Sequence, residues 1–301
     1  MKDQANKLRE MALNLRNQIE ADLGKEIRHT RVISVSSGKG GVGKSTLALN
    51  LALKLCAMGK RVLIMDADLG MANIDIMLGL VPKYNLYHMI RDKKPLKDII
   101  INGPGGLKII PGGSGMNELA NLQEEEMKRI LVEMGKLDGD YDYMVVDTGA
   151  GISNNVVKFL LAGDDVIVLT TPEPTSLTDA YGVVKSVNRY GFNGNIYLVV
   201  NRVARESEGI LVAQKFKLVS EKFLALNINI LGYIVQDNHV EQGIRRQEAF
   251  AEVFPNSLAA QNITDIAERL LENDGARTPV LPTRNGGIKG FIKKLTGFSR
   301  P

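Results

Sequence analysis

Short runs of β-branched and apolar residues alternate with longer stretches of helical period from Arg31 onward. This alternation is typical of an α/β domain with a mostly parallel, twisted sheet flanked by helices. The predicted strands are 32–36, 61–65, 107–110, 143–147, 165–170, 196–201 and 230–234. The predicted helices are 44–58, 124–136, 154–161, 176–189, 212–226 and 257–272. Residues 31–273 contain no internal repeat and no break in composition, so one domain is expected there.

Both ends of the chain differ from this domain. Residues 1–30 form an N-terminal extension with an amphipathic helical stripe made of Leu8, Ala12, Leu15, Ile19 and Leu23. Residues 274–286 contain prolines and glycines and predict a linker. Residues 287–301 predict a second amphipathic helix with an apolar face and lysines beside it: Ile288, Phe291, Ile292, Leu295 and Phe298, with Lys289, Lys293 and Lys294.

A basic amphipathic helix after a linker is typical of an interfacial membrane anchor that prefers anionic lipid. A single copy of so short a helix binds weakly, whereas two copies on a dimer gain effective concentration. The sequence leaves a second arrangement open, in which the same helix docks on its own domain.

Composition narrows the classes of function. The chain has 301 residues, 44% of them apolar, and a single cysteine, Cys56, which excludes an internal disulfide and a Cys-rich zinc site. A reducing, cytoplasmic setting fits best, and no run approaches the length of a membrane span. Of the net charge of +4, residues 275–301 contribute six basic groups and no acid, which leaves 32 basic and 34 acidic groups elsewhere. A general affinity for nucleic acid is therefore unlikely in this interpretation.

A glycine-rich loop follows the first predicted strand. Its sequence, S-G-K-G-G-V-G-K-S-T, satisfies G-x-x-x-x-G-K-[ST] between a strand and a helix. Glycines let successive N–H groups surround a phosphate chain at a helix N-terminus. Lys44 supplies charge to the β and γ phosphates, and Ser45 offers a hydroxyl to Mg²⁺. The predicted nucleotide-binding residues of this loop are Gly38, Lys39, Gly40, Gly41, Val42, Gly43, Lys44, Ser45 and Thr46.

Carboxylates follow two other apolar strands. Asp66 and Asp68 end V-L-I-M-D-A-D, and Asp147 ends Y-M-V-V-D before the glycines at 149 and 151. Ligand groups of open α/β sheets gather at such strand ends. The segment that ends in Asp66 and Asp68 resembles the second acidic motif of deviant Walker A ATPases, which implies that Asp66 lies near the water ligands of Mg²⁺ and that Asp68 orients the attacking water. Asp147 ends a Walker B strand and is predicted to bind Mg²⁺ through water. Carboxylates are poor proton acceptors near neutral pH, so Asp68 is expected to position the water rather than to act as a strong base, which predicts slow turnover.

The extra lysine, Lys39, gives K-G-G-x-G-K-S, and this resembles the deviant Walker A family that includes MinD, ParA and the nitrogenase iron protein. The resemblance covers about residues 31–270 and implies an ATPase that binds ATP or ADP with Mg²⁺. It also implies that Lys39 reaches a partner copy's nucleotide, so that hydrolysis by Lys39, Lys44 and Asp68 depends on a homodimer. Asn201 and Arg202 stand where this family places an adenine contact. No N-K-x-D motif occurs, which favours ATP over GTP.

The first residues, D-Q-A-x-x-L-R, resemble the N-terminal motif of the FlhG family of flagellar regulators. The resemblance implies that Asp3, Gln4, Ala5, Leu8 and Arg9 stimulate the signal-recognition-particle-type GTPase FlhF. It also implies control of flagellum number and placement, with attachment at the inner face of the cell membrane and flagellar switch proteins of the C-ring among the partners. One departure is Gly149, which stands where a Pro or other residue is common in the MinD switch, so the geometry of that switch stays open.

Two other functions remain open. One is a MinD- or ParA-like ATPase that positions a division site, DNA or cargo, which the near-neutral domain mildly disfavours. The other is an iron–sulfur carrier of the same fold, which the lone cysteine makes improbable. For the N-terminal stripe, packing on the chain's own core is the alternative to partner activation.

Overall fold

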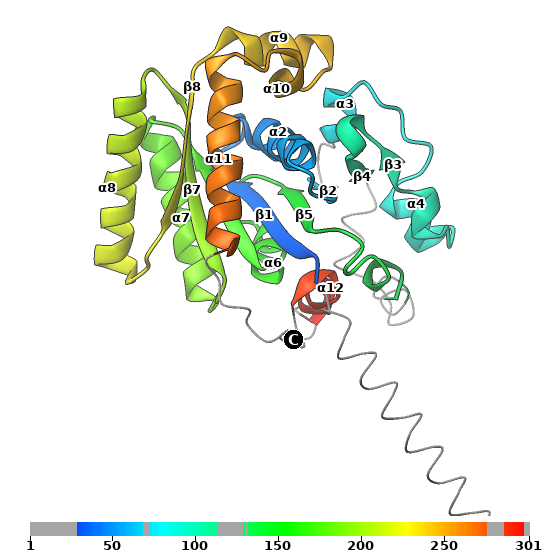
Figure 1. The fold of residues 1–301 in the computed structure, drawn as a ribbon. Helices are drawn as coiled ribbons and strands as arrows, with labels where there is room; N and C mark the ends of the chain where they lie inside the picture. Colours follow the sequence, from blue (N-terminus) through cyan, green and yellow to red (C-terminus); the bar gives the residue numbers. More distant parts are fainter. Residues whose placement is uncertain (1–28, 69–72, 113–128, 130–131, 276–285, 298–301) are drawn as a thin grey trace, which may run out of the picture.

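The computed structural model describes residues 29–68, 73–112, 129, 132–275 and 286–297. The predicted architecture is confirmed: eight strands form one sheet in the order β3-β4-β2-β5-β1-β6-β7-β8, and only the β3–β4 pair is antiparallel (Figure 1). The strands are β1 Arg31–Ser37, β2 Val62–Ala67, β3 Ile101–Asn102, β4 Lys108–Ile110, β5 Tyr143–Thr148, β6 Asp165–Thr170, β7 Asn195–Val203 and β8 Asn229–Val235.

Helices cover both faces of the sheet, and no helix in the described part of the chain is both long and apolar enough to cross a bilayer. The α-helices are α2 Lys44–Ala57, α3 Ile74–Met77, α4 Leu86–Arg91, α6 Asn154–Ala162, α7 Pro174–Arg189, α8 Glu206–Leu224, α9 Asn238–Arg246, α10 Phe250–Val253, α11 Leu258–Gly275 and α12 Gly287–Gly297, with 3₁₀ turns η1 Leu96–Asp98 and η2 Pro104–Gly106.

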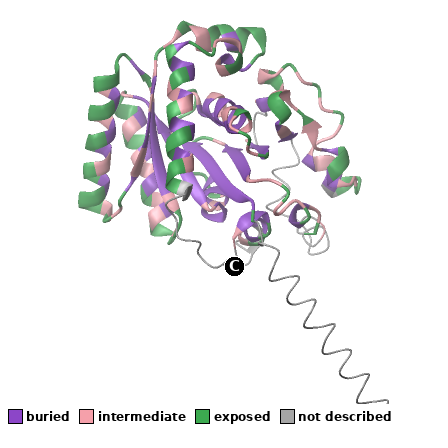
Figure 2. Ribbon diagram, in the orientation of Figure 1, coloured by how far each residue is buried: buried purple, intermediate pink, exposed green. Residues whose placement is uncertain are grey.

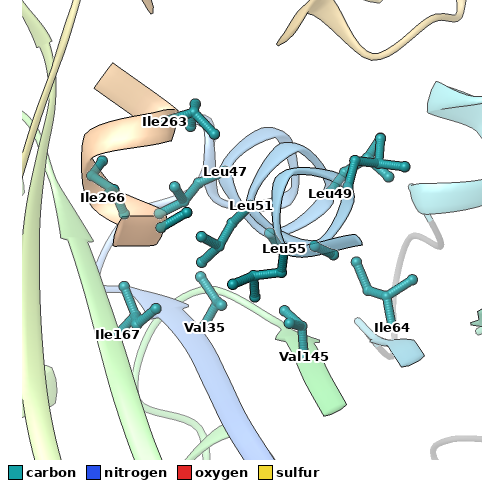
Figure 3. Packing of buried hydrophobic residues seen from close by; sticks show 14 of the residues in the cluster. Val35, Leu47, Leu49, Leu51, Leu55, Ile64, Val145, Ile167, Ile263 and Ile266 are labelled. Atoms are coloured by element: carbon teal, nitrogen blue, oxygen red, sulfur yellow. The ribbon is translucent and has the colours of Figure 1, made fainter. Parts of the chain in front are cut away.

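The core lies in two layers on either side of the sheet, because successive residues of a strand point to opposite faces. Helices α2, α10 and α11 pack on one face, and Figure 3 shows Leu51 and Leu55 of α2 pointing toward the strands and Leu47 lying beside Ile263 and Ile266 of α11. Helices α6, α7, α8 and α12 pack on the other face. The central strands are buried throughout, and the outer sides of the helices face solvent (Figure 2).

All seven predicted strands are present. The structure adds β3, a strand of two residues, and the short helices α3, α4 and α10, which are too brief to produce a periodic pattern. It also adds the nine-residue helix α9. The predicted helix 124–136 falls partly outside the described residues, and 132–135 are helical. Helix α8 begins at Glu206, earlier than predicted, with Glu206 and Glu208 in its first turn, where carboxylates favour the helix dipole.

The predicted C-terminal helix is confirmed as α12, and of the two arrangements left open the structure has the docked one. Ile288, Phe291, Ile292 and Leu295 are buried against the domain, between 0% and 8% exposed. The Phe291 ring lies 6.2 Å from that of Phe159 on α6. Lys293 is exposed and Lys294 is half-buried, while Phe298 lies outside the described residues.

Candidate active site

The glycine loop begins where β1 ends and finishes where α2 begins. Gly41 and Gly43 have φ angles of 76° and 97°, which side chains rarely adopt. A Cβ on Gly38 would lie 2.1 Å from the backbone of Asp179 on α7, and one on Gly43 would lie 2.5 Å from Nδ2 of Asn201. The loop therefore has glycine where packing and backbone angle require it, and its N–H groups stand at the start of a helix, which suits an anion.

Lys44 forms the buried ion pair of the site. Its Nζ lies 2.7 Å from Oδ1 of Asp147 at the end of β5, and the two side chains are 8% and 0% exposed. Burial is the main cause that raises the pKa of Asp147, and Lys44 and the Ser45 hydroxyl oppose it. The loop lysine and the strand carboxylate, which the sequence assigns to phosphate and to Mg²⁺, are thus brought together at one centre.

The second carboxylate oxygen of Asp147 fits a bound metal. Oδ2 is buried and has no hydrogen-bond partner among the described residues. An uncompensated buried oxygen is costly, and a hard cation with oxygen ligands would satisfy it. The Ser45 hydroxyl also interacts with the Asp147 carboxylate and counters the rise of its pKa. Mg²⁺ held by Asp147 and Ser45 would neutralise charge on the phosphates.

Asp66 and Asp147 are register partners on the neighbouring strands β2 and β5. The buried carboxylate of Asp66 accepts hydrogen bonds from the N–H groups of Asp68 at 3.1 Å, Asn73 at 2.7 Å and Ile74 at 3.1 Å. Burial, followed by the charge of Asp147, raises the pKa of Asp66 to about 6. Asp66 therefore anchors the segment that carries Asp68, and its role near metal-bound water stays a prediction.

Asp68 stands close to the same centre. Its charge contributes to raising the pKa of Asp147, and a Cβ built on Gly149 would lie 3.9 Å from Asp68 Oδ1. The Gly151 N–H donates to the Ser37 carbonyl at 2.8 Å, which ties the 149–151 turn to the start of the glycine loop. Asp68 is thus placed beside the predicted switch, where it could orient a water molecule.

Lys39 has different surroundings from Lys44. Its Nζ pairs with Oε2 of Glu173, just before α7, at 3.2 Å. The side chains are 45% and 62% exposed. Such a surface pair contributes little to stability, typically 0–1 kcal/mol. Lys39 is therefore held at the surface and can leave Glu173 at small cost.

A cleft of about 340 Å³ opens beside the glycine loop. Asn201 lines it and donates from Nδ2 to the Val42 carbonyl at 2.7 Å, which joins the end of β7 to the loop. Arg202, also on the lining, has a φ of 57°. The two residues are brought together with the loop as predicted, although the amide of Asn201 holds the loop itself.

The sequence prediction missed several residues of this cleft: Asn238, Glu241, Ile244 and Phe250. Gln236, also on the lining, directly follows β8, and strand ends line the ligand edge of an open sheet. Asp237, also on the lining, accepts the N–H groups of His239 at the start of α9 and of Ala259 in α11, at 2.9 and 3.2 Å. It therefore fixes the cleft wall.

The remaining predicted residues belong to the two ends of the chain. The partner-activating residues Asp3, Gln4, Ala5, Leu8 and Arg9 are outside the described residues. The predicted membrane residues of α12 lie beneath β1 and α6, at the opposite edge of the sheet from the glycine loop (Figure 1).

Fold and site together define a P-loop nucleotide hydrolase of the MinD/ParA type. The AAA domain family matches residues 30–198. MinD of Pyrococcus horikoshii, solved in complex with Mg-ADP, superposes with a TM-score of 0.67 and 27% identity over 83% of this chain and 100% of that one.

Curated relatives narrow the assignment. Antiactivator FleN of Pseudomonas aeruginosa is 35% identical over 88% of this chain and 93% of its own length. Flagellum site-determining protein YlxH of Helicobacter pylori is 34% identical over 90% of this chain and 91% of its own length. The chain therefore belongs to the FleN/YlxH family, also called FlhG, of MinD/ParA-type ATPases, and its enzymatic activity is the hydrolysis of ATP.

Proposed function

We propose that this chain is an ATP-dependent dimerising switch that associates reversibly with the membrane and regulates the number and placement of flagella. The observation that carries the proposal is the contrast between two lysines of one loop. Lys44 pairs with Asp147 and its side chain is 8% exposed, whereas Lys39 pairs with the surface residue Glu173 and its side chain is 45% exposed. One lysine is therefore built to serve the chain's own nucleotide, and the other is available to a second copy.

In the proposed reaction, Lys44 and the loop N–H groups bind the phosphates, and Ser45 with Asp147 holds Mg²⁺. Asp68 orients the attacking water in line with the γ-phosphoryl group. Lys39 of the second copy stabilises the charge that develops on the transferred group, as an arginine finger does in other P-loop enzymes. Hydrolysis then removes the phosphate that joins the two subunits, and the dimer separates.

Size-exclusion chromatography with light scattering tests this step. The full chain is run without nucleotide, with Mg-ADP and with Mg-ATP. We expect a dimer with Mg-ATP alone, and we expect Lys39→Ala to remain a monomer that still binds ATP. Lys60→Ala, an exchange at another lysine outside the loop, serves as the control and dimerises like the wild type. A monomer that hydrolyses ATP at an undiminished rate on dilution would refute the switch.

Membrane association is proposed through α12. In the docked state its apolar residues are buried, so attachment requires the helix to leave its site. Liposome sedimentation with anionic vesicles and Mg-ATP tests this. Deletion of residues 288–298 should abolish binding, and Lys39→Ala should remove its dependence on ATP. Pelleting of both variants regardless of nucleotide would contradict the proposal.

The N-terminal extension is proposed to stimulate the GTPase FlhF. The support is the D-Q-A-x-x-L-R sequence together with the family assignment. A peptide of residues 1–23 should accelerate GTP hydrolysis by FlhF, and Gln4→Ala should remove the effect. Asn6→Ala, at an x position of the same motif, is the matched control and should keep it. If the unaltered peptide did not accelerate GTP hydrolysis, the alternative, in which this segment packs on the chain's own core, would be favoured.

The names of the relatives support the flagellar setting. C-ring proteins as further partners and a place at the inner face of the cell membrane are proposed on the family resemblance alone. The second candidate is positioning of a division site or cargo, favoured by MinD of Bacillus subtilis at 27% identity over 88% of this chain. A null strain would separate the two: misplaced or extra flagella support the first, and misplaced septa support the second. A DNA shift assay on the chain lacking residues 275–301 tests a DNA matrix.

A further inference from the structure

At the end of the sheet where the parallel strands begin, opposite the glycine loop, two segments lie together that are far apart in the sequence. One is the start of β1, where the N-terminal extension enters the domain. The other is the start of α12, which lies beside β1 and α6 (Figure 1). Two carboxylates, Asp138 and Asp164, lie between them.

Asp138 joins the two segments directly. Its Oδ1 accepts the N–H of Thr30 at 3.1 Å and the N–H of Ile288 at 3.2 Å. Its Oδ2 lies 3.2 Å from Nδ1 of His29, and the Asp138 side chain is only 2% exposed. A single buried carboxylate thus bonds to both the root of the N-terminal extension and the first turn of α12.

Asp164 makes a similar pair of contacts, with a partner two residues later in β1 and one residue earlier in α12. Its Oδ2 accepts the N–H of Val32 at 2.9 Å. Burial raises the pKa of Asp164, and the N–H groups of Val32 and Gly287, with the Lys294 charge, act against that rise. The first N–H groups of a helix lack intrahelical partners and favour negative charge. The two carboxylates therefore cap α12 while they hold β1.

Gly287 shows that this junction is closely fitted. Its φ is 72°, and a Cβ at this position would lie 2.4 Å from Oδ1 of Asp138. Any other residue would have to displace the same oxygen that accepts the Thr30 and Ile288 N–H groups. Movement of the α12 start and movement of Asp138 are therefore coupled by contact as well as by hydrogen bonding.

We propose that Asp138 and Asp164 form a shared anchor that couples the docking of α12 to the position of residues 29–32. Undocking of α12 removes an N–H partner from each carboxylate, and the anchor then holds the root of the N-terminal extension less firmly. Coupling of this kind is reciprocal, so a partner that pulls on the extension loosens α12. This use of the anchor rests on the proposed function. Release of α12 to lipid would then change how the N-terminal extension is held, and binding of a GTPase to the extension would change how α12 is held.

Hydrogen–deuterium exchange of the full chain, without nucleotide, lipid or partner, tests the coupling. Leu295→Ala loosens α12 two turns away from the anchor. We expect exchange to rise in residues 286–292 and also in residues 29–32, by at least about threefold in the second segment. With Asp138→Ala already present, adding Leu295→Ala should raise exchange in residues 29–32 by less than it does in the wild type.

Three further variants complete the experiment. Asp138→Ala alone should raise exchange in both segments, and Asp138→Asn, which keeps one oxygen acceptor, should give a smaller rise. Asp140→Ala, at a nearby exposed carboxylate, should change neither segment. If Asp138→Ala impairs folding, Asp138→Asn takes its place in the double variant, since it keeps the size of the side chain and removes the charge that strengthens the bonds from Thr30 and Ile288.

The outcomes separate this proposal from the proposed function. A rise confined to α12 in Leu295→Ala, or a rise in one segment alone in Asp138→Ala, would overturn the shared anchor. Neither result depends on ATP or vesicles. A negative liposome assay would contradict the proposed membrane role, but the coupling measured between α12 and residues 29–32 would still stand.

Discussion

Two buried carboxylates, Asp147 and Asp138, lie at opposite ends of the parallel strands and are satisfied to different degrees. At the glycine-loop edge, Asp147 has one oxygen on Lys44 and one with no hydrogen-bond partner among the described residues. At the other edge, Asp138 accepts two backbone N–H groups and contacts His29. A satisfied carboxylate stabilises the positions of its partners, whereas an unsatisfied one keeps capacity for a ligand. The comparison therefore favours ligand binding at the glycine-loop end, where Asp147 lies, and a structural anchor at the other end, where Asp138 lies.

The largest effect is expected at the reactive edge. Lys44→Ala should lower the rate of ATP hydrolysis by at least about 10²-fold, because it removes the main positive charge on the phosphates in a buried site. It also leaves Asp147 without its charged partner. Steady-state phosphate release measures the effect, with a melting curve to confirm folding. Lys54→Ala at the far end of α2 is the control, and similar rates in the two variants would remove Lys44 from the mechanism.

The next effect is the pH dependence of Asp66. Its pKa rises from 3.8 to about 6 on folding, so the folded chain binds this proton more tightly than the unfolded chain. The free energy of unfolding should therefore fall as pH rises from about 4 to 6, by up to about 3 kcal/mol from this group, and stay level above.

Urea unfolding of the wild type and of Asp66→Asn across this pH range checks the sign. The Asn variant should lose the part of the slope that Asp66 contributes. Equal slopes in the two proteins would show that Asp66 does not carry a raised pKa in the folded chain.

At the anchoring edge, Gly287→Ala and Gly191→Ala form a matched pair. The two φ angles are 72° and 73°, but a Cβ would meet Asp138 at Gly287 and nothing within 4 Å at Gly191. The strain of a positive φ, about 1 kcal/mol, is common to both. Gly287→Ala should cost at least about 1 kcal/mol more, because the new Cβ must displace a buried carboxylate.

Exchange protection of α12 measures the difference, since a steric clash at its start loosens the helix before the whole domain. Gly191→Ala should leave α12 protection unchanged. Equal protection of α12 in both variants would mean that the close approach at Asp138 is relieved without cost.

The sequence was most informative at the reactive edge. A phosphate loop needs consecutive glycines and one lysine, so Gly43 and Lys44 could be placed from their spacing, and strand-end carboxylates such as Asp147 follow from the sheet. The strands themselves were predictable because buried parallel strands are nearly continuous apolar runs. The two-residue strand β3 could not be found, because its pairing with β4 decides its conformation.

The anchoring edge was hidden from the sequence. Asp138 stands in a polar segment, L-D-G-D, that predicts only a turn, and its partners Thr30 and Ile288 are more than a hundred residues away. The amphipathic pattern of α12 fits lipid and protein equally, because both offer an apolar surface. Only the docked structure distinguishes them, since Phe159 of α6 lies beside Phe291.

The smallest effect concerns Lys39, and it tests whether this lysine belongs to the fold or to an assembly. Glu173→Gln breaks its exposed pair, and Glu221→Gln breaks a comparable exposed pair with Lys217 on α8, at 3.9 Å and away from the cleft. Each should change the free energy of unfolding by less than about 1 kcal/mol. Only Glu173→Gln should alter the ATP concentration at which dimers form, measured by analytical ultracentrifugation, because it removes the charge with which Lys39 pairs in the single subunit. A destabilisation by Glu173→Gln well above that of Glu221→Gln would mean that Lys39 is held by its own domain, which would weaken the contrast with Lys44.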